Sequence, residues 1–164
     1  MRSRIIVLLL SVLGALLPTA SLARDLHEHW DSRCKSCHGD SAAFARSTLR
    51  VEQGRLLGRH HVADLPKFLH NHHLADDLVA PVSAMLMAQV NTKPLFKTHC
   101  AGCHDSAAAL ARRSLLMHGA VLTGKINQRP VADFLRRHGG LAATEVAPMV
   151  TTLRRVLAET GGGG

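Results

Sequence analysis

The chain is poor in the side chains that usually give a core its bulk or build a surface for nucleic acid. Aromatic residues make up 3% of its 164 residues and tyrosine is absent, so large ring side chains are scarce. Lysine and arginine form no run interleaved with aromatics, which argues against nucleic-acid binding. Alternating β-branched runs are also missing, so the sequence predicts no sheet and no thioredoxin-like domain.

Long apolar stretches are missing too, apart from one near the N-terminus. Arg2 and Arg4 precede an apolar run over residues 5–17. Ser21-Leu22-Ala23 then has the small-x-small pattern of a cleavage site. This run of thirteen residues is shorter than the roughly twenty needed to span a bilayer. The sequence therefore predicts a signal peptide over residues 1–23, export, and no transmembrane helix after cleavage.

Cysteine occurs only four times, always within a repeated motif. Cys34-Lys35-Ser36-Cys37-His38 returns as Cys100-Ala101-Gly102-Cys103-His104. Two thiols about one helical turn apart can each form a thioether to a porphyrin, and the adjacent histidine can ligate its iron. A tetrathiolate zinc site and a redox dithiol also use C-x-x-C, but neither explains a histidine after both pairs. The motif predicts two covalently bound haem c groups, attached through Cys34, Cys37, Cys100 and Cys103, with His38 and His104 as proximal iron ligands.

The rest of the chain is an internal repeat, with an offset of 66 residues that drifts to 67. An aromatic residue, Trp30 or Phe96, stands four positions before the first cysteine of each motif. The pattern F-L-x-x-H occurs at 68–72 and again at 134–138. We expect a first haem domain over 24–90, a second over 91–160, and a disordered tail over 161–164.

Each repeat is predicted to end in a helix. Asp77 and Thr144 occupy equivalent positions and are good N-cap residues. Pro81 and Pro148 follow four residues later, where proline is tolerated, and apolar residues then recur at helical spacing. Because no comparable pattern indicates strands, the expected fold class is all-α, with two small tandem haem domains.

Histidine is predicted to supply the second axial ligand of each iron. His72 and His138 lie at equivalent positions shortly before the predicted N-caps, and imidazole suits iron. In the first repeat His73 is the alternative, and its counterpart in the second repeat is Gly139. No methionine pair is shared by the two repeats, and Met149 is predicted to be a core residue. Other histidines are expected to be solvated, namely His27, His29, His60, His61, His70 and His99.

A family resemblance rests on these motifs. The segment from Leu95 to His104 resembles the haem-binding start of class I c-type cytochromes, and Trp30 to His38 resembles it more weakly. The resemblance implies a tandem dihaem protein with cytochrome c-like domains, and a periplasmic role in bacterial electron transfer. The chain departs from that family in lacking a Met-Pro-type distal loop, and for this reason we expect bis-histidine iron.

The expected function is electron transfer rather than catalysis, because iron with two histidine ligands leaves no open position for a substrate. The alternative is a haem-based ligand sensor or a small haem enzyme, in which one iron would keep an open coordination site. After cleavage, 18 basic and 12 acidic residues remain, which favours an acidic redox protein or a membrane electron-transfer complex as partner. The candidate docking residues are Arg46, Arg50, Arg55, Arg59, Arg112, Arg113 and Lys125.

Overall fold

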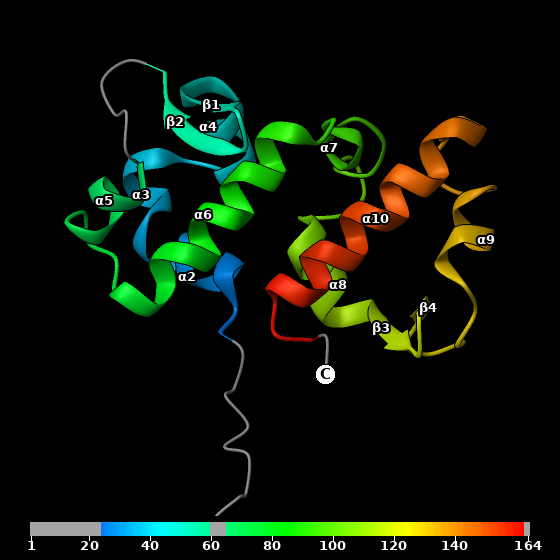
Figure 1. Cartoon of the computed structure of the whole chain (residues 1–164). Helices are drawn as coiled ribbons and strands as arrows, with labels where there is room; N and C mark the ends of the chain where they lie inside the picture. The colour runs from blue at the N-terminus through cyan, green and yellow to red at the C-terminus, as the bar shows by residue number, and fades with distance from the viewer. Residues whose placement is uncertain (1–23, 60–64, 163–164) are drawn as a thin grey trace, which may run out of the picture.

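The computed structural model of this chain describes residues 24–59 and 65–162 (Figure 1). The predicted signal peptide, residues 1–23, lies outside the described residues, as do His60 and His61. None of the described helices is long and apolar enough to cross a membrane.

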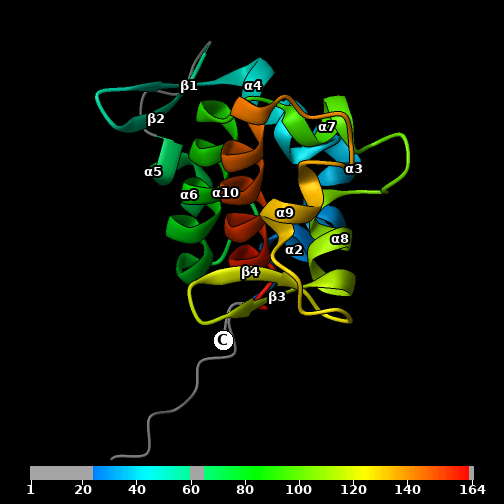
Figure 2. The same ribbon diagram turned by 90° about the vertical axis from the view of Figure 1, so that its right-hand side faces the viewer.

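The two halves of the chain have nearly the same order of elements, each at an offset of about 66 residues (Figures 1 and 2). In the first half these are α2 (Leu26–Arg33), α3 (Lys35–His38), α4 (Ser41–Thr48), β1 (Leu49–Glu52), β2 (Arg55–Gly58), α5 (Leu65–His70) and α6 (Asp76–Asn91). In the second half they are α7 (Leu95–His99), α8 (Ala107–Ser114), β3 (Leu115–His118), β4 (Val121–Gly124), α9 (Val131–Leu135) and α10 (Ala143–Glu159).

The expectation of an all-α fold is wrong, because each half contains a two-stranded antiparallel hairpin. In the first hairpin Leu49 pairs with Gly58, and in the second Leu115 pairs with Gly124. The first turn has two consecutive residues at positive φ, Gln53 at 48° and Gly54 at 74°. Two-residue turns of this kind match the twist of paired strands. Strands of four residues are too short to show a clear period of two, so the sequence pattern did not reveal them.

The closing helices, α6 and α10, begin earlier than predicted. Their N-caps are Ala75 and Ala142, so Asp77 and Thr144 are the second residues of the helices rather than the caps. In α10 the Glu145 carboxylate accepts a hydrogen bond of 2.9 Å from the Ala142 amide, which is half of a capping box. This bond satisfies the N-cap amide, whereas neither alanine cap has a side-chain acceptor for the first amides of its helix.

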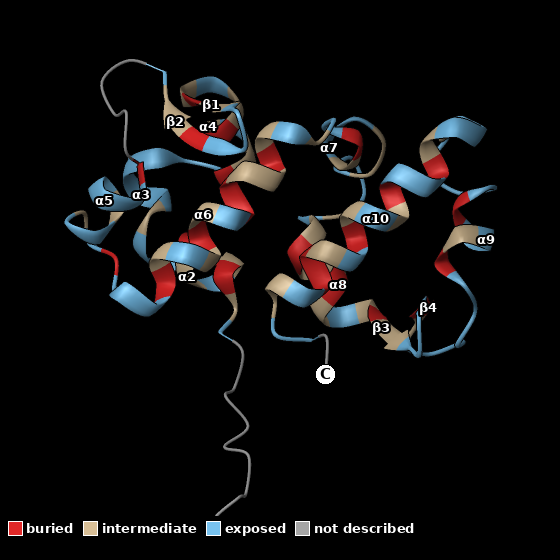
Figure 3. Cartoon of the chain, in the orientation of Figure 1, coloured by how far each residue is buried: buried red, intermediate tan, exposed pale blue. Residues whose placement is uncertain are grey.

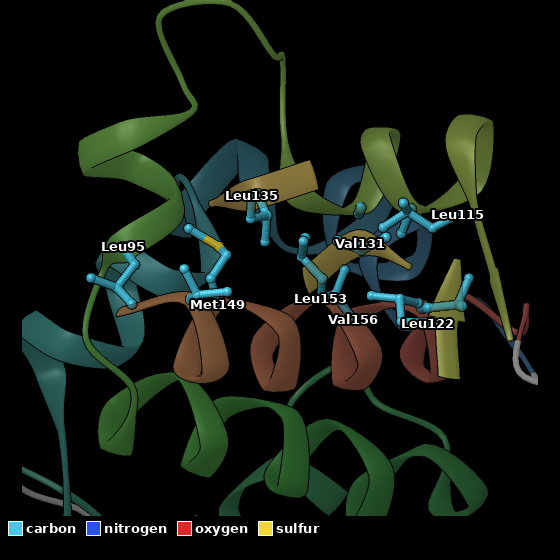
Figure 4. Close-up of a cluster of buried hydrophobic side chains, with 12 residues drawn as sticks. Leu95, Leu115, Leu122, Val131, Leu135, Met149, Leu153 and Val156 are labelled. Carbon is cyan, nitrogen blue, oxygen red and sulfur yellow. The ribbon is translucent and has the colours of Figure 1, made fainter. Parts of the chain in front are cut away.

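Each half has its own hydrophobic core (Figure 3). In the second half, side chains from α7, the hairpin, α9 and α10 converge on one cluster (Figure 4). Met149, which the sequence predicted to be a core residue, is completely buried there. The first cluster is built from residues 26–86 in the same way and includes Trp30, which is 5% exposed.

Ion pairs connect the first helix of one half to two helices of the other. Arg112 of α8 donates from Nε and Nη2 to the two oxygens of Asp25, at 2.5 and 2.8 Å. His27 of α2 lies 2.8 Å from the Glu159 carboxylate of α10, which Arg155 also contacts at 2.6 Å. His27 was expected to be solvated, but it is mostly buried in this contact. The link between the halves therefore depends on charged groups in addition to packing.

The C-terminal glycines close α10. Gly161 has φ of 74°, and its amide donates to the Ala158 carbonyl while the Gly162 amide donates to Leu157. This is the Schellman arrangement, in which glycine takes the left-handed conformation without steric cost. The first two residues of the expected disordered tail are therefore part of the helix end, and residues 163–164 lie outside the described part of the chain.

The Asp25–Arg112 pair yields a test of the link between the halves. Burial alone would raise the pKa of Asp25, but the Arg112 hydrogen bond, the Glu28 amide and the charges of Arg112 and His27 outweigh it and lower that pKa. A carboxylate with a lowered folded pKa stabilises the protein above its unfolded pKa, and this stabilisation is lost as the pH falls through the folded value.

We predict that Asp25→Asn lowers the free energy of unfolding of the mature protein by about 1 kcal/mol at pH 7, because the part-exposed pair is screened by solvent. Asparagine can still cap α2, so the change isolates the charge. The difference from wild type should shrink below about pH 4, where aspartate is normally protonated. Urea unfolding at several pH values measures it. Glu52→Gln, in the exposed pair with Arg50, is the control; an equal loss in both variants would contradict the prediction.

Candidate functional site

Both C-x-x-C-H motifs fold into the same turn. The His38 amide donates to the Cys34 carbonyl at 2.9 Å, and the His104 amide donates to the Cys100 carbonyl at 2.9 Å. These are i to i+4 bonds of a helical turn, so the first cysteine and the histidine lie on one face. The second cysteine of each motif donates its amide to the carbonyl of the first cysteine, three residues earlier, at 3.2 and 3.1 Å. The repeated spacing therefore produces one repeated local geometry.

The aromatic residue before each motif anchors this turn to the core. The Cys34 amide donates to the Trp30 carbonyl, and the Cys100 amide donates to the Phe96 carbonyl. Trp30 also donates from Nε1 to the Gly39 carbonyl at 2.9 Å, which closes the chain over the first motif. The ring centres of Trp30 and His38 are 6.2 Å apart. The aromatic residue thus attaches the motif to the core, and in the first half its ring lies next to the motif histidine.

A second histidine faces the motif histidine in each half. The ring centres of His38 and His72 are 5.9 Å apart, with planes at 60°. Those of His104 and His138 are 6.2 Å apart, with planes at 62°. Each pair joins the motif turn to the turn that follows a short helix, α5 or α9. The four histidines expected to be axial ligands are therefore brought together in two equivalent pairs.

The separation of the rings fits one metal ion between them. A bond from an imidazole nitrogen to a first-row metal such as zinc is about 2.0 Å, and each ring centre lies roughly 1 Å beyond its nitrogen. A shared metal would therefore hold the ring centres about 6 Å apart. Two ring planes can contain the same metal–nitrogen axis at any mutual rotation, so angles of 60° and 62° are compatible with it.

The donor set suits a porphyrin iron better than a bare ion. Within residues 24–59 and 65–162, no three or more His, Cys, Asp or Glu side chains gather as a metal site. A bare zinc ion in a structural site takes four protein ligands. A haem iron already has the porphyrin nitrogens and needs only axial ligands from the protein. Two histidines facing one another match that requirement.

An apolar pocket surrounds the second pair. Its volume is ≈ 300 Å³, and its lining includes Cys100, His104 and His138. Leu110 and Leu153 are among the apolar residues that form its walls. Ligand pockets in proteins are typically apolar with a few polar groups, and their volumes begin at about 300 Å³. The cysteine and both histidines therefore share a cavity suited to a largely apolar group.

The first pair lies among aromatic rings. Phe44, the counterpart of Leu110, has its ring centre 4.7 Å from that of His38 and 5.4 Å from that of Trp30. Desolvation by the surrounding chain, and then the neighbouring His72 imidazole, lower the pKa of His38. A lowered pKa favours the neutral imidazole, which is the form that ligates metals. Residues 60–64, the counterparts of residues 126–130 at the repeat offset of 66, lie outside the described chain.

The four methionines in the described part of the chain belong to the cores rather than to the histidine pairs. Met85 and Met149 are 1% and 0% exposed within the first and second clusters. Met87 and Met117 pack against the same clusters from outside. Thioethers engaged in core packing are poor candidates for axial ligands, which supports histidine in that role.

The surroundings of the cysteines favour neither of the alternative C-x-x-C sites. Cys34 packs against the first core and Cys100 against the second, so the described chain does not bring the two pairs into one tetrathiolate site. Burial raises the pKa of both thiols. A redox dithiol instead relies on a lowered thiol pKa. All four cysteines are free of disulfides and remain available for another bond.

His73, the alternative to His72, has its ring centre 5.3 Å from that of His72. It has φ of 56°, and its counterpart Gly139 has φ of 83°, so this repeat position is a left-handed turn in both halves.

Two other histidines expected to be solvated make ion pairs: His70 with Asp76 at 2.6 Å, and His99 with Glu145 at 3.4 Å. The buried Nε2 of His29 has no hydrogen-bond partner among the described residues.

Sequence reasoning missed the aromatic partners of these histidines. Phe68 stacks on His72 and Phe134 stacks on His138. The recurring F-L-x-x-H pattern was the available signal, because residues four apart share a helix face. In contrast, no repetition pointed to Phe44, whose counterpart is aliphatic.

The chain matches no protein-family model, no curated protein and no solved structure.

Proposed function

We propose that the protein is an exported, periplasmic dihaem electron carrier that binds two covalent haem c groups with bis-histidine iron. The observation that supports this most strongly is the repeated pairing of a C-x-x-C-H histidine with a second histidine, at 5.9 and 6.2 Å between ring centres. Each bound haem c would supply a one-electron iron couple.

The chain's own residues would have separate tasks in this role. The four cysteine thiols would form the thioethers, and His38 and His104 would be the proximal ligands. His72 and His138 would close the opposite side of each iron and exclude exogenous ligands. The apolar wall around the second pair would limit access of water, which influences the reduction potential. No side chain needs to gain or lose a proton for this function.

The alternative function, a haem-based ligand sensor or small haem enzyme, needs a position open to a ligand or substrate. A histidine faces the motif histidine in both halves, which favours the electron carrier. The two functions differ in a simple property, since an open or weakly held position makes ferric haem high-spin and able to bind azide.

We predict that the mature protein, produced in a host that attaches haem c to exported proteins, carries two haems per chain and is low-spin in both oxidation states. The pyridine haemochrome spectrum counts the haems, and the visible and near-infrared spectra report ligand type. One haem per chain, or none, would refute the dihaem proposal. A high-spin ferric species that binds azide readily would favour the sensor or enzyme.

We predict that His72→Ala opens the first iron only, and that His138→Ala opens the second only. Each variant should bind one carbon monoxide per chain when reduced. Methionine at either site should raise the potential of that haem, because a thioether ligand raises it relative to imidazole. His73→Ala is the matched control and should leave both haems closed. Opening of the first haem by His73→Ala alone would transfer the ligand role to His73.

The proposed partner is an acidic redox protein or membrane complex. The pocket walls around the second pair include three exposed basic residues, Arg129, Arg137 and Lys125. The walls also include two exposed apolar residues at the rim, Phe134 and Ile126. An apolar centre with a charged border is typical of protein docking surfaces. Arg112, an expected docking residue, is instead committed to its pair with Asp25. The docking surface is therefore proposed at the second site.

We predict that oxidation of the reduced protein by the anion hexacyanoferrate(III) slows as salt is added, since screening shortens charge attraction to roughly 8 Å at physiological ionic strength. Stopped-flow rates give the salt dependence. Arg129→Glu and Arg137→Glu should each weaken it more than Arg154→Glu, an exposed residue of α10 in the same half. Equal effects of the three variants, or a rate independent of salt, would rule out steering at this surface.

A further inference from the structure

Two phenylalanines at equivalent positions stack on the second histidine of each pair. The ring centres of Phe68 and His72 are 4.7 Å apart with planes at 24°, and those of Phe134 and His138 are 4.4 Å apart with planes at 30°. Both phenylalanines are largely exposed, at 42% and 56%. The same contact therefore occurs twice, each time at the surface.

Core packing does not explain these phenylalanines. In F-L-x-x-H the leucine makes the core contact: Leu135 is 6% exposed, and Leu69 packs against the first cluster. The adjacent phenylalanine keeps a large exposed surface, so its burial contributes less hydrophobic stabilisation than that of a core residue. Its distinguishing contact is the face of the imidazole.

The histidines need an external restraint on their rings. His72 and His138 follow the short helices α5 and α9, and their amides donate to Leu69 and Leu135 at 3.0 and 3.4 Å. These bonds position the backbone, but rotation of an imidazole about its last side-chain torsion has broad minima. The ring contacts of His138 in the structure are with Phe134 and His104. A stacked phenylalanine thus limits the ring to orientations that face the motif histidine.

We infer that Phe68 and Phe134 are positioning residues that stack on the distal imidazoles and orient them toward the proximal histidines. This inference rests on the proposed haem binding and extends it to residues outside the ligand set. Aromatic pairing of this kind is expected to favour the closed iron over an opened one by about 2- to 10-fold in the equilibrium constant.

The test measures the binding of cyanide to the ferric protein. Cyanide competes with the distal histidine for the iron. Phe134→Leu preserves an apolar side chain but removes the ring, and should raise the apparent cyanide association constant of one haem about 2- to 10-fold. Phe134→Tyr should retain the wild-type value. Val121→Ala, at an exposed apolar residue (49%) of the same half, is the control. Phe68→Leu should act on the first haem alone. Unchanged cyanide binding in both leucine variants would overturn the inference.

A second measurement separates this inference from the haem proposal. In the unloaded chain, proton NMR should show the His138 ring protons shifted upfield by the Phe134 ring current. The shift should disappear in Phe134→Leu and persist in Phe134→Tyr. Protein that never acquires haem but shows this shift would refute the proposed function while leaving the stack in place. Loaded, low-spin protein with no effect of the phenylalanine substitutions would refute only the positioning role.

Discussion

The position of the two imidazole rings in each half depends on one constraint, the packing of two short turns on a common core. One ring belongs to a helical turn that hydrogen-bonds back to the first cysteine, and the other belongs to a turn after a short helix. Neither turn is long enough to be stable alone, since isolated helices of this length are marginal in water. The core beneath them, with buried leucines from the same short helices and the closing helix, therefore holds the two rings about 6 Å apart.

The two halves use the same construction but differ around the motif histidine. In the first half Phe44 lies against His38, whereas in the second half Leu110 lines an apolar pocket. An aromatic ring fills space that an aliphatic side chain leaves available, so the local polarity and solvent access around the two proposed haems would differ. Such differences shift reduction potentials even when axial ligands are identical. A duplicated chain can in this way provide two unequal redox centres.

Charged contacts connect the halves, and they set their relative position more specifically than apolar packing alone would. The bidentate Asp25–Arg112 pair has fixed geometry, because a guanidinium presents its donors in a planar fork. Glu159 is contacted by both His27 and Arg155, so its carboxylate has two partners at a mostly buried site. For an electron carrier with two proposed centres, a defined relative position of the halves keeps the distance between those centres constant.

Sequence repetition by itself determined the paired motifs, the equivalence of His72 and His138, and the core role of Met149, because these depend on residue type and spacing. It did not reveal the hairpins, since strands of four residues are stabilised by pairing with a partner rather than by their own pattern. The caps of α6 and α10 were misplaced because both N-cap positions hold alanine, whereas the sequence pattern pointed to the polar residues two positions later. Only the tertiary structure decided that the second histidine of each pair lies next to its motif histidine, that phenylalanine stacks on it, and that His27 pairs with Glu159. These contacts join residues far apart in the chain or depend on ring orientation, and both are set by packing of the folded cores.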